Sequence, residues 1–244
     1  MNDMIPLCRW LFQEPSGSLR MSEGEYPYAL REMNGPINRV NDGIVGPYSA
    51  EITQGQWFNL PRRFCPALDI HGKDAQLSIM AWIKRKQKSF NECEAISGMW
   101  NETNNQRQYC VFLNLGIWNS SQEVCGHLSS TGGPSPNYPY CMEAAIGNIS
   151  VSLNEWHLIG VTYDGNWAKV YLDGKLDFRP GLSPYFWPCA INNMPDNGPD
   201  FTVGAVNRSG VMGNFFVGQL GGLAIYNQVL TDQQIEDLYR SHKV

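Results

Sequence analysis

The segment from Trp156 to Lys175, WHLIGVTYDGNWAKVYLDGK, predicts two short β-strands that are joined by one Asp-Gly turn and followed by another. In its second half, Ala168, Val170 and Leu172 alternate with polar and aromatic residues, which is the period of two expected for a strand with one buried face. The Asp-Gly pairs supply the positive φ angles that tight hairpin turns need. The preceding run, Leu158 to Tyr163, is apolar on both faces, as in a strand inside a sandwich. This hairpin therefore predicts antiparallel β-structure.

Other segments predict further strands, which are separated by long connections. The expected strands lie near residues 5–12, 49–60, 77–85, 94–100, 109–115, 200–206 and 215–226. The connections Arg31–Gly46, Leu128–Tyr140 and Pro180–Pro199 are rich in Gly, Pro and Asn, and loops of this length often carry binding residues. No internal repeat or break in composition divides the chain, so we expect residues 1–244 to form one domain.

One helix is expected near the C-terminus. The hydroxyl of Thr231 can accept a hydrogen bond from the third backbone N–H of a helix, and Gln234 can reach back, which makes a capping box. Ile235, Leu238 and Tyr239 follow at helical spacing and form an apolar stripe that can pack on a sheet. We therefore expect an all-β sandwich with one short C-terminal helix covering its core.

The charge of the chain argues against two classes of partner. The formal net charge is −5 and no basic stripe compensates locally, so neither nucleic acid nor an anionic membrane is an expected partner. No apolar run approaches the ~20 residues of a transmembrane helix, so membrane insertion is not expected either. The N-terminus carries an acid and lacks the apolar core of a signal peptide. The protein stays inside the cell, or it is secreted and a signal was removed; the sequence does not separate these alternatives.

The cysteines leave several alternatives open. There is no CxxC pair, and an odd number leaves at least one free thiol. Cys110, Cys125, His127 and Cys141 have the composition of a zinc shell, but their spacing matches no zinc motif. If the protein is exported, a Cys125–Cys141 or Cys93–Cys110 disulfide is plausible, whereas buried free thiols are expected inside a cell. The seven cysteines are Cys8, Cys65, Cys93, Cys110, Cys125, Cys141 and Cys189.

Several separated segments, taken together, resemble one family. They are RWLFQEPSG at 9–17, ALDI at 67–70 with LSIMAWI at 77–83, the hairpin WHLIGVTYDG with VYLDGKL, FTVG at 201–204, and 216–226 leading into VLT at 229–231. In this order they resemble the laminin-G-like, concanavalin A-like jelly-roll domains, and the resemblance covers nearly the whole chain. It implies two antiparallel sheets stacked as a jelly roll. It also implies a range of functions, namely carbohydrate binding, protein adhesion, calcium-assisted ligand capture and occasional glycoside cleavage.

Calcium is the cofactor that this resemblance raises. Family members often carry acidic residues in the penultimate strand, where this chain has Gly221-Gly222. Glu14, Asp164 and Asp173 remain as candidate oxygen ligands, although turn formation explains the two aspartates. Calcium takes six to eight oxygens, and loop carbonyls can supply several of them. The sequence therefore neither establishes nor excludes a calcium site, and no other cofactor is expected.

The sequence offers no clear catalytic constellation. Glycosidases on related folds need two carboxylates facing one cleft, and the glucanase pattern E-x-D-x-x-E is absent. Glu92 and Glu94 are two residues apart and are expected at a solvated strand entrance. No GxSxG elbow is present, and none of the histidines has an evident serine or cysteine partner. His157 is expected to be a packed strand residue. We therefore expect a protein that is not an enzyme.

Aromatic and polar residues in and beside the loops suggest a sugar site. Aromatic faces cover the apolar side of a sugar ring, and amide, guanidinium and carboxylate groups bond its hydroxyls. Trp100 and Trp118 are either exposed binding residues or part of the core. We expect a non-catalytic module that binds carbohydrate or a glycoconjugate, with carbohydrate or glycoprotein as its partner; a protein–protein adhesion or scaffold module is the alternative and a glycoside hydrolase of this fold is third. The candidate ligand-binding residues are Trp100, Asn101, Arg107, Trp118, His127, Tyr138 and Arg208.

Overall fold

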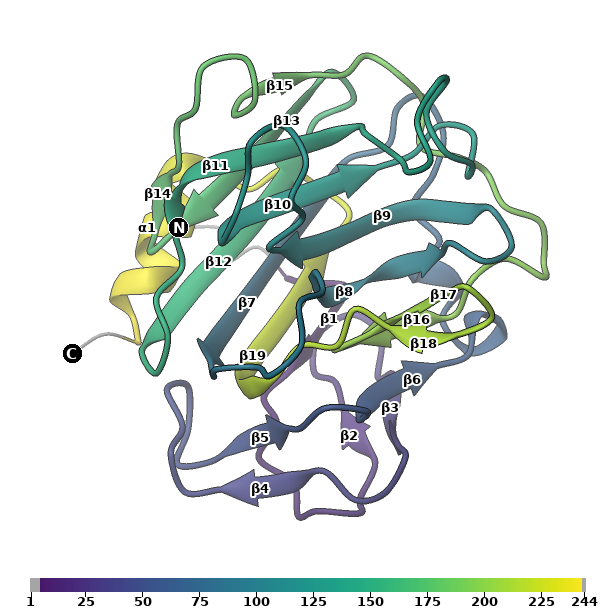
Figure 1. Ribbon diagram of the computed structural model, residues 1–244. Helices are drawn as coiled ribbons and strands as arrows, with labels where there is room; N and C mark the ends of the chain where they lie inside the picture. Colours follow the sequence, from purple (N-terminus) through teal and green to yellow (C-terminus); the bar gives the residue numbers. More distant parts are fainter. Residues whose placement is uncertain (1–4, 243–244) are drawn as a thin grey trace.

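Two antiparallel sheets are stacked face to face in the computed structural model, which describes residues 5–242 (Figure 1). The first sheet has the strand order β14-β13-β12-β7-β19-β5-β4, with β1 beside β19 and β15 beside β13. Its strands are β1 (Cys8–Trp10), β4 (Asn38–Val40), β5 (Ser49–Ile52), β7 (Leu77–Arg85), β12 (Trp156–Tyr163), β13 (Trp167–Leu172), β14 (Lys175–Leu176), β15 (Tyr185–Phe186) and β19 (Gly218–Tyr226).

The second sheet lies in front of the first in Figure 1 and has the order β11-β10-β9-β8-β16-β6-β3-β2, with the small β17–β18 ribbon beside β8. The expected two-sheet sandwich is therefore confirmed. The strands of the second sheet are β2 (Arg20–Met21), β3 (Ala29–Met33), β6 (Trp57–Leu60), β8 (Glu94–Asn101), β9 (Gln106–Leu113), β10 (Glu123–Leu128), β11 (Ala144–Ser150), β16 (Phe201–Val203), β17 (Val206–Arg208) and β18 (Val211–Gly213). Two 3₁₀ turns, η1 (Arg62–Phe64) and η2 (Pro66–Leu68), follow β6.

The hydrophobic core fills the space between the two sheets. Trp10, Phe58, Tyr109 and Val161 are among its buried residues and come from strands of both sheets. Burying one aliphatic or phenylalanine side chain completely contributes about 1.5–3 kcal/mol, so this layer supplies most of the favourable energy of folding. The outer faces of the two sheets do not contribute to this layer, and each carries a smaller cluster of its own.

The hairpin predicted from 156–175 forms as expected. β12 and β13 pair with Val161 opposite Val170. Gly165 and Gly174 have φ angles of +93° and +80°, which L-residues with a side chain rarely adopt. Asp164 Oδ1 accepts hydrogen bonds from the backbone N–H groups of residues 166 and 167, at 2.9 and 2.7 Å. The first aspartate is therefore a turn former.

The C-terminal helix α1 (Asp232–Arg240) is also confirmed, and it lies against the outer side of the first sheet (Figure 1). Thr231 and Gln234 form the predicted capping box. Ile235 is buried in a cluster with Met80 and Trp82, and the ring of Trp82 stacks on Tyr239 with 5.7 Å between centroids. Among the described residues, no helix is long and apolar enough to cross a membrane.

Some strand boundaries differ from the expectation. The strand predicted near 5–12 is only β1, because Phe12 adopts a φ of +56° and ends the extended run. The single strand expected at 49–60 is two strands, β5 and β6, which belong to different sheets on either side of a turn at Thr53–Gln56. β10 and β11 were not predicted. β10 is buried along its whole length, so it lacks the alternation that marks a half-buried strand.

Candidate functional site

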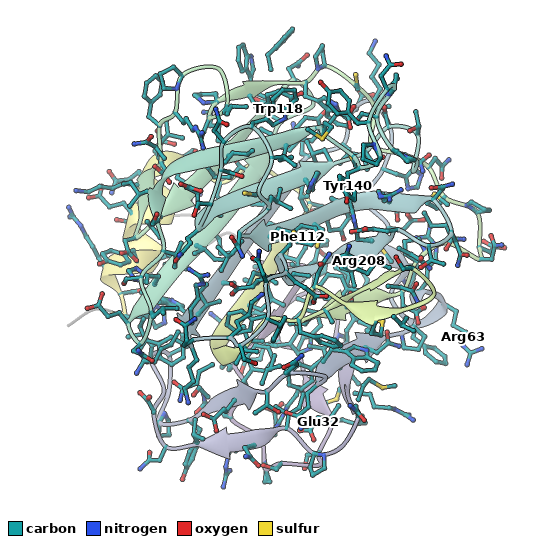
Figure 2. The ribbon with its side chains drawn as sticks, viewed as in Figure 1. Glu32, Arg63, Phe112, Trp118, Tyr140 and Arg208 are labelled. Carbon is teal, nitrogen blue, oxygen red and sulfur yellow. The ribbon has the colours of Figure 1, made fainter. Side chains whose placement is uncertain are left out.

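The face of the second sheet that points away from the core carries a second buried cluster. Figure 2 shows Trp118, Tyr140, Phe112 and Arg208 spread over this side of the sheet. The loops after β9 and after β10 lie against it and contribute Leu115, Ile117 and Cys141 to the packing. The cluster consists of Ala95, Trp100, Cys110, Phe112, Cys125, Cys141, Ala144, Ile146 and Val206.

A β-bulge brings Trp100 and Arg107 to this outer face. Met99 pairs with Tyr109 and both side chains lie in the core, whereas the next pair is Trp100 with Arg107. Gln108 is therefore an extra residue in β9, and its side chain reaches toward Asp69 and the backbone of Asn192. Directly opposed residues of antiparallel strands share a face, so the bulge places the indole and the guanidinium side by side. The guanidinium carbon lies 5.9 Å from the Trp100 ring centroid.

A cavity of about 320 Å³ opens on this face, and we call it the outer-face cavity. Its apolar floor is formed by three rings, with 4.9 Å between the centroids of Trp100 and His127 and 5.6 Å between those of Phe112 and His127. Its remaining lining consists of Asn91, Glu92, Cys93, Glu102, Arg107, Asn114, Leu115, Gly116, Ile117, Tyr140, Cys141, Arg208 and Asn214.

His127 presents a hydrogen-bond acceptor to the cavity. Its Nδ1 lies 3.1 Å from the backbone oxygen of Glu143, and because a carbonyl can only accept, Nδ1 carries the proton. Burial lowers the pKa of His127 to about 4, against a weaker opposing effect of Glu143, so the ring is neutral at pH 7. The other nitrogen, Nε2, is then an acceptor, and it has no hydrogen-bond partner among residues 5–242.

The walls supply donors and acceptors of both charges. The buried Arg107 donates through Nη1 to the backbone oxygen of Gly132 at 2.9 Å, and burial lowers its pKa against the opposing pull of Glu102. Arg208 Nη1 donates to the side chain of Asn214 at 2.7 Å. Asn214 in turn donates through its backbone N–H to Glu92 at 3.1 Å and through its amide to Glu102 at 3.4 Å. Two arginines and two glutamates line the cavity, so their formal charges balance.

The structure brings together four of the seven residues predicted to bind a ligand. Trp100, Arg107, His127 and Arg208 all line the outer-face cavity. Trp100 is 2% exposed, so of the two alternatives that the sequence left open for this residue the structure shows the buried one: its ring packs in the cluster under the loops. Asn101 does not line the cavity, because its side chain bonds Gln106 and the backbone of residue 104 and so closes the turn between β8 and β9.

Trp118 and Tyr138 lie at the surface beside the cavity. They are 43% and 45% exposed, and their ring centroids are 6.1 Å apart. The indole N–H of Trp118 donates to the backbone oxygen of Met142 at 2.9 Å, which fixes the ring without covering it. The neighbouring residues Ile117 and Tyr140 do line the cavity. We call Trp118 and Tyr138 the rim aromatics.

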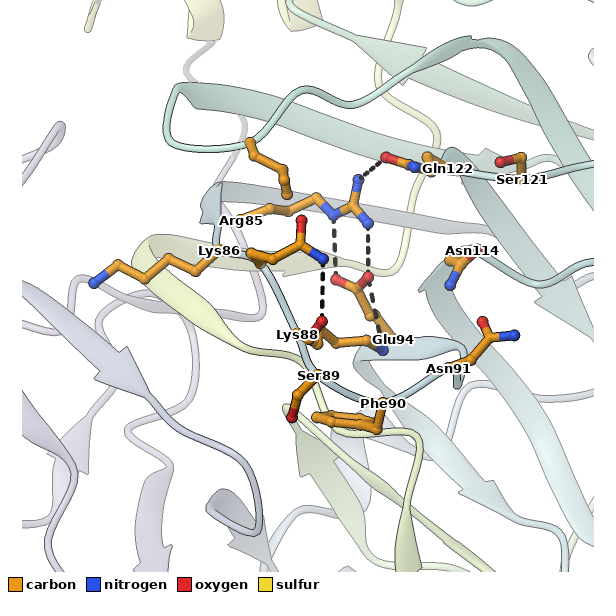
Figure 3. Close-up of a pocket in the computed structure, with 12 residues that line it drawn as sticks. Arg85, Lys86, Lys88, Ser89, Phe90, Asn91, Glu94, Asn114, Ser121 and Gln122 are labelled. Carbon is orange, nitrogen blue, oxygen red and sulfur yellow. Dashed lines mark hydrogen bonds and ion pairs between the residues drawn. The ribbon is translucent and has the colours of Figure 1, made fainter.

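Several residues of the outer-face cavity were not predicted from the sequence. Phe112 lies within the strand predicted at 109–115 and Asn214 just before the strand predicted at 215–226, and neither was named as a candidate. Glu92 and Glu94 were expected to share a solvated strand entrance, and the structure shows this to be wrong for Glu94. Glu94 is buried and accepts a hydrogen bond from Arg85 Nη2 at 2.6 Å. Of this pair of glutamates, Glu92 lines the outer-face cavity and Glu94 does not. The Arg85–Glu94 pair lines a second cavity of about 470 Å³, shown in Figure 3, which we call the edge cavity.

The candidate metal ligands do not converge. Glu14 accepts from the backbone N–H of Met21 at 2.8 Å, Asp164 holds its turn, and Asp173 bonds His157. No group of three or more His, Cys, Asp or Glu side chains within 5–242 is arranged to hold a metal ion. At Gly221, a β-carbon would lie 2.6 Å from Ile44 Cγ2, so the packing leaves no room for an acidic side chain at this position.

The cysteines are all free thiols. Neither of the disulfides considered above is formed. The zinc shell considered from the sequence is not formed among the described residues. Cys110 lies opposite His127 on the paired strands β9 and β10, whereas Cys141 Sγ lies 3.0 Å from a carboxylate oxygen of Glu143. Burial raises the pKa of the Cys110 thiol well above its ordinary value. Cys110, Cys125 and Cys141 act as small buried residues in the cluster under the loops.

His157 has a serine and an aspartate as hydrogen-bond partners, which was not predicted from the sequence. His157 lies on β12, with Nε2 2.7 Å from Ser152 Oγ and Nδ1 2.8 Å from Asp173 Oδ2. The expectation that no histidine has a serine partner is therefore wrong. Ser152 belongs to the loop after β11 and Asp173 to the turn after β13, and antiparallel pairing brings both to one end of β12.

Comparison with known proteins places the chain in a family. The sequence pattern of the concanavalin A-like lectin/glucanases superfamily matches residues 65–236, which is more than half of the chain. The chain belongs to this superfamily. Every residue that lines the outer-face cavity of this concanavalin A-like domain lies inside the matched region. The comparison with curated protein sequences gives no match.

Solved structures share this concanavalin A-like fold at low sequence identity. Domain 4 of AbnA, an extracellular arabinanase of Geobacillus stearothermophilus solved with arabinotriose, has a TM-score of 0.56 at 16% identity, with 92% of this chain and 98% of that one covered. The CBM40 of the Ruminococcus gnavus IT-sialidase, bound to α2,3-sialyllactose, has a TM-score of 0.56 at 14% identity, with 78% and 96% covered.

A larger relative also matches. The botulinum neurotoxin serotype D ligand-binding domain, solved in complex with N-acetylneuraminic acid, has a TM-score of 0.61 at 10% identity. The match covers 97% of this chain and 50% of that one, so the chain spans half of the toxin domain. At these identities the three structures share the fold with this chain.

Proposed function

We propose that this protein binds carbohydrate in the outer-face cavity and does not cleave it. The observation that carries the proposal is the combination of an aromatic floor with buried polar groups that still have free hydrogen-bonding capacity. His127 offers an acceptor at Nε2, Arg107 offers donors beside the ring of Trp100, and Arg208 offers donors in the wall of the cavity. Sugar hydroxyls both donate and accept, so they satisfy such a mixture better than an apolar ligand does.

The charge balance of the lining favours a polyhydroxylated ligand over a strongly charged one. Two arginines face two glutamates, so neither sign dominates the cavity. The carboxylates of Glu92 and Glu102 both accept hydrogen bonds from Asn214. These hydrogen bonds hold the wall of the cavity around Asn214 together. We therefore assign Glu92 and Glu102 a role in binding rather than in acid–base catalysis.

The rim aromatics extend this site beyond the cavity. Trp118 and Tyr138 are about half exposed, and an aromatic face stacks well on the apolar side of a sugar ring. The two relatives that this chain spans almost completely were solved with arabinotriose and with α2,3-sialyllactose. Both ligands are oligosaccharides, which supports a site that is longer than one sugar unit.

A glycan array that includes arabinotriose and α2,3-sialyllactose tests the proposal. We expect binding to at least one glycan, weakened about 10- to 100-fold in Arg208→Ala, because a hydrogen bond to a charged group is worth about 1.5–3 kcal/mol. Arg63→Ala is the matched control, since Arg63 is exposed and does not line the cavity. Silence across the array from correctly folded protein contradicts the proposal.

A second candidate function, protein–protein adhesion, is favoured by a different surface. Trp167 and Phe186 are both exposed on paired strands β13 and β15, with 4.8 Å between their ring centroids. Exposed aromatic residues are enriched at protein interfaces. A protein that binds a partner through this pair loses binding in Trp167→Ala but not in Arg208→Ala, which separates the two candidates.

A further inference from the structure

Ser152, His157 and Asp173 form a continuous hydrogen-bonded line at one end of β12. Ser152 Oγ lies 2.7 Å from His157 Nε2, and His157 Nδ1 lies 2.8 Å from Asp173 Oδ2. These are the distances at which a general base is in contact with both its nucleophile and its orienting carboxylate. The same geometry of serine, histidine and aspartate recurs on unrelated folds, so it is recognised by roles and distances rather than by chain order.

The surrounding backbone holds the aspartate and the histidine in these positions. Asp173 Oδ1 accepts from the backbone N–H of Leu158 at 3.1 Å, and the backbone N–H of Asp173 donates to Leu158 O at 2.8 Å. Because a carboxylate can only accept, His157 Nδ1 carries the proton and Nε2 presents its lone pair to Ser152. The His157 side chain is 13% exposed, whereas Ser152 is exposed to solvent.

We propose that Ser152 is a nucleophile that cleaves carboxylic esters, with His157 as its general base and Asp173 as a positioning residue. This activity is independent of the carbohydrate binding proposed above. In the first step Ser152 Oγ bonds to the ester carbonyl carbon while its proton passes to His157 Nε2. The carbon–oxygen bond to the alcohol then breaks, and the alcohol leaves with that proton. Water next attacks the acyl-serine, again giving its proton to His157, and releases the carboxylic acid with Ser152 restored.

Two further residues of the loop fit this chemistry. Ser152 Oγ donates a hydrogen bond to Glu155 Oε2 at 2.8 Å, so its one hydroxyl hydrogen must turn from Glu155 to His157 Nε2 before the attack. Glu155 Oε2 also lies 3.9 Å from His157 Nε2, so its charge stabilises the imidazolium that forms when His157 takes the proton. Asn154 carries the only side-chain amide of the loop 151–155, and this amide has no hydrogen-bond partner among the described residues. A free amide donor of this kind suits the oxyanion that develops on the substrate.

The exposure of Ser152 sets the class of substrate. An open serine reaches acyl groups that project from a larger molecule, such as acetyl esters, without enclosing the acyl chain. The next residue, Leu153, lines the edge cavity, whose polar lining includes Gln122 and Arg85 (Figure 3). Because one of its lining residues directly follows Ser152 in the sequence, the edge cavity can hold part of the molecule that carries the ester.

Two probes test the proposal on the full chain: a fluorophosphonate, with the labelled peptide mapped by mass spectrometry, and p-nitrophenyl acetate. We expect labelling at Ser152 and ester hydrolysis that falls about 100-fold or more in Ser152→Ala and in His157→Gln. Ser130→Ala is the matched control and is expected to keep full activity, because Ser130 is also exposed but lies outside the triad. Absence of labelling at Ser152, or equal hydrolysis by Ser152→Ala, overturns the proposal.

Asp173→Asn distinguishes catalysis from a structural role. Asp173 has a φ of +51°, which asparagine tolerates, and the amide oxygen can still accept from Leu158. We therefore expect an unchanged melting temperature together with a kcat for p-nitrophenyl acetate that falls at least 100-fold at similar KM, because the neutral amide no longer fixes the tautomer of His157. An unchanged kcat rules out the positioning role of Asp173.

Discussion

The indole of Trp100 and the indole of Trp118 lie on the same side of the molecule but in different environments. Trp100 packs against Phe112 and His127 and is almost fully buried, whereas Trp118 is held at the surface by one hydrogen bond to Met142. Removing a large buried aromatic side chain leaves a cavity in the packing, which costs about 3–5 kcal/mol. The two tryptophans should therefore respond differently to the same substitution.

We predict that Trp100→Ala lowers the free energy of unfolding by about 3–5 kcal/mol, and that Trp118→Ala changes it by less than about 1 kcal/mol. Urea denaturation of both variants measures the difference. In a binding assay, Trp118→Ala weakens glycan binding while the protein remains folded, so it is the variant that reports on ligand contact. Similar stability of the two variants would contradict the burial of Trp100.

At the scale of elements, the loop after β9 is the part of the site that depends most on a distant residue. Trp118 and Asn119 both have positive φ angles, +51° and +55°, which are strained for side-chain-bearing residues. Arg179, which follows β14, donates through Nη2 to the backbone oxygens of these two residues, at 2.9 and 3.1 Å. The guanidinium therefore stabilises this conformation of the loop.

We predict that Arg179→Ala weakens glycan binding about tenfold without opening the outer-face cavity, because the rim aromatic Trp118 loses its fixed position. Arg179→Lys should recover only part of the affinity, since one ammonium cannot replace both guanidinium nitrogens: Nη2 bonds the loop, and Nη1 donates to the backbone oxygen of Gly147 at 3.2 Å. Titration calorimetry gives the affinities, and amide hydrogen exchange of residues 116–120 should be faster in Arg179→Ala. Unchanged exchange in that segment would count against the clamp.

For the whole molecule, the sequence predicted the architecture well because its strongest signals are local. The hairpin β12–β13, the helix α1 and their turns follow from alternation, Asp-Gly pairs and a capping box. β10 and the bulge at Gln108 do not follow from such signals, because full burial removes alternation and a bulge depends on the partner strand. Arg107 and His127 could be named as candidates, but their meeting with Trp100 required the register of β8, β9 and β10.

The stability of the whole fold should depend on pH through His127. Burial lowers its folded-state pKa to about 4, whereas an unfolded chain has a histidine pKa near 6.5, so between these values the unfolded state binds more protons. The contribution is complete above about pH 6.5 and is lost as pH falls toward 4, by about 3 kcal/mol in total. His127→Asn, whose amide can still donate to Glu143, should show a shallower loss between pH 7 and pH 4 than the parent protein. Urea denaturation between pH 4 and pH 7 measures the free energy of unfolding of both proteins. If that free energy changes equally with pH in the parent and in His127→Asn, the folded protein does not lower the pKa of His127 and the prediction is wrong.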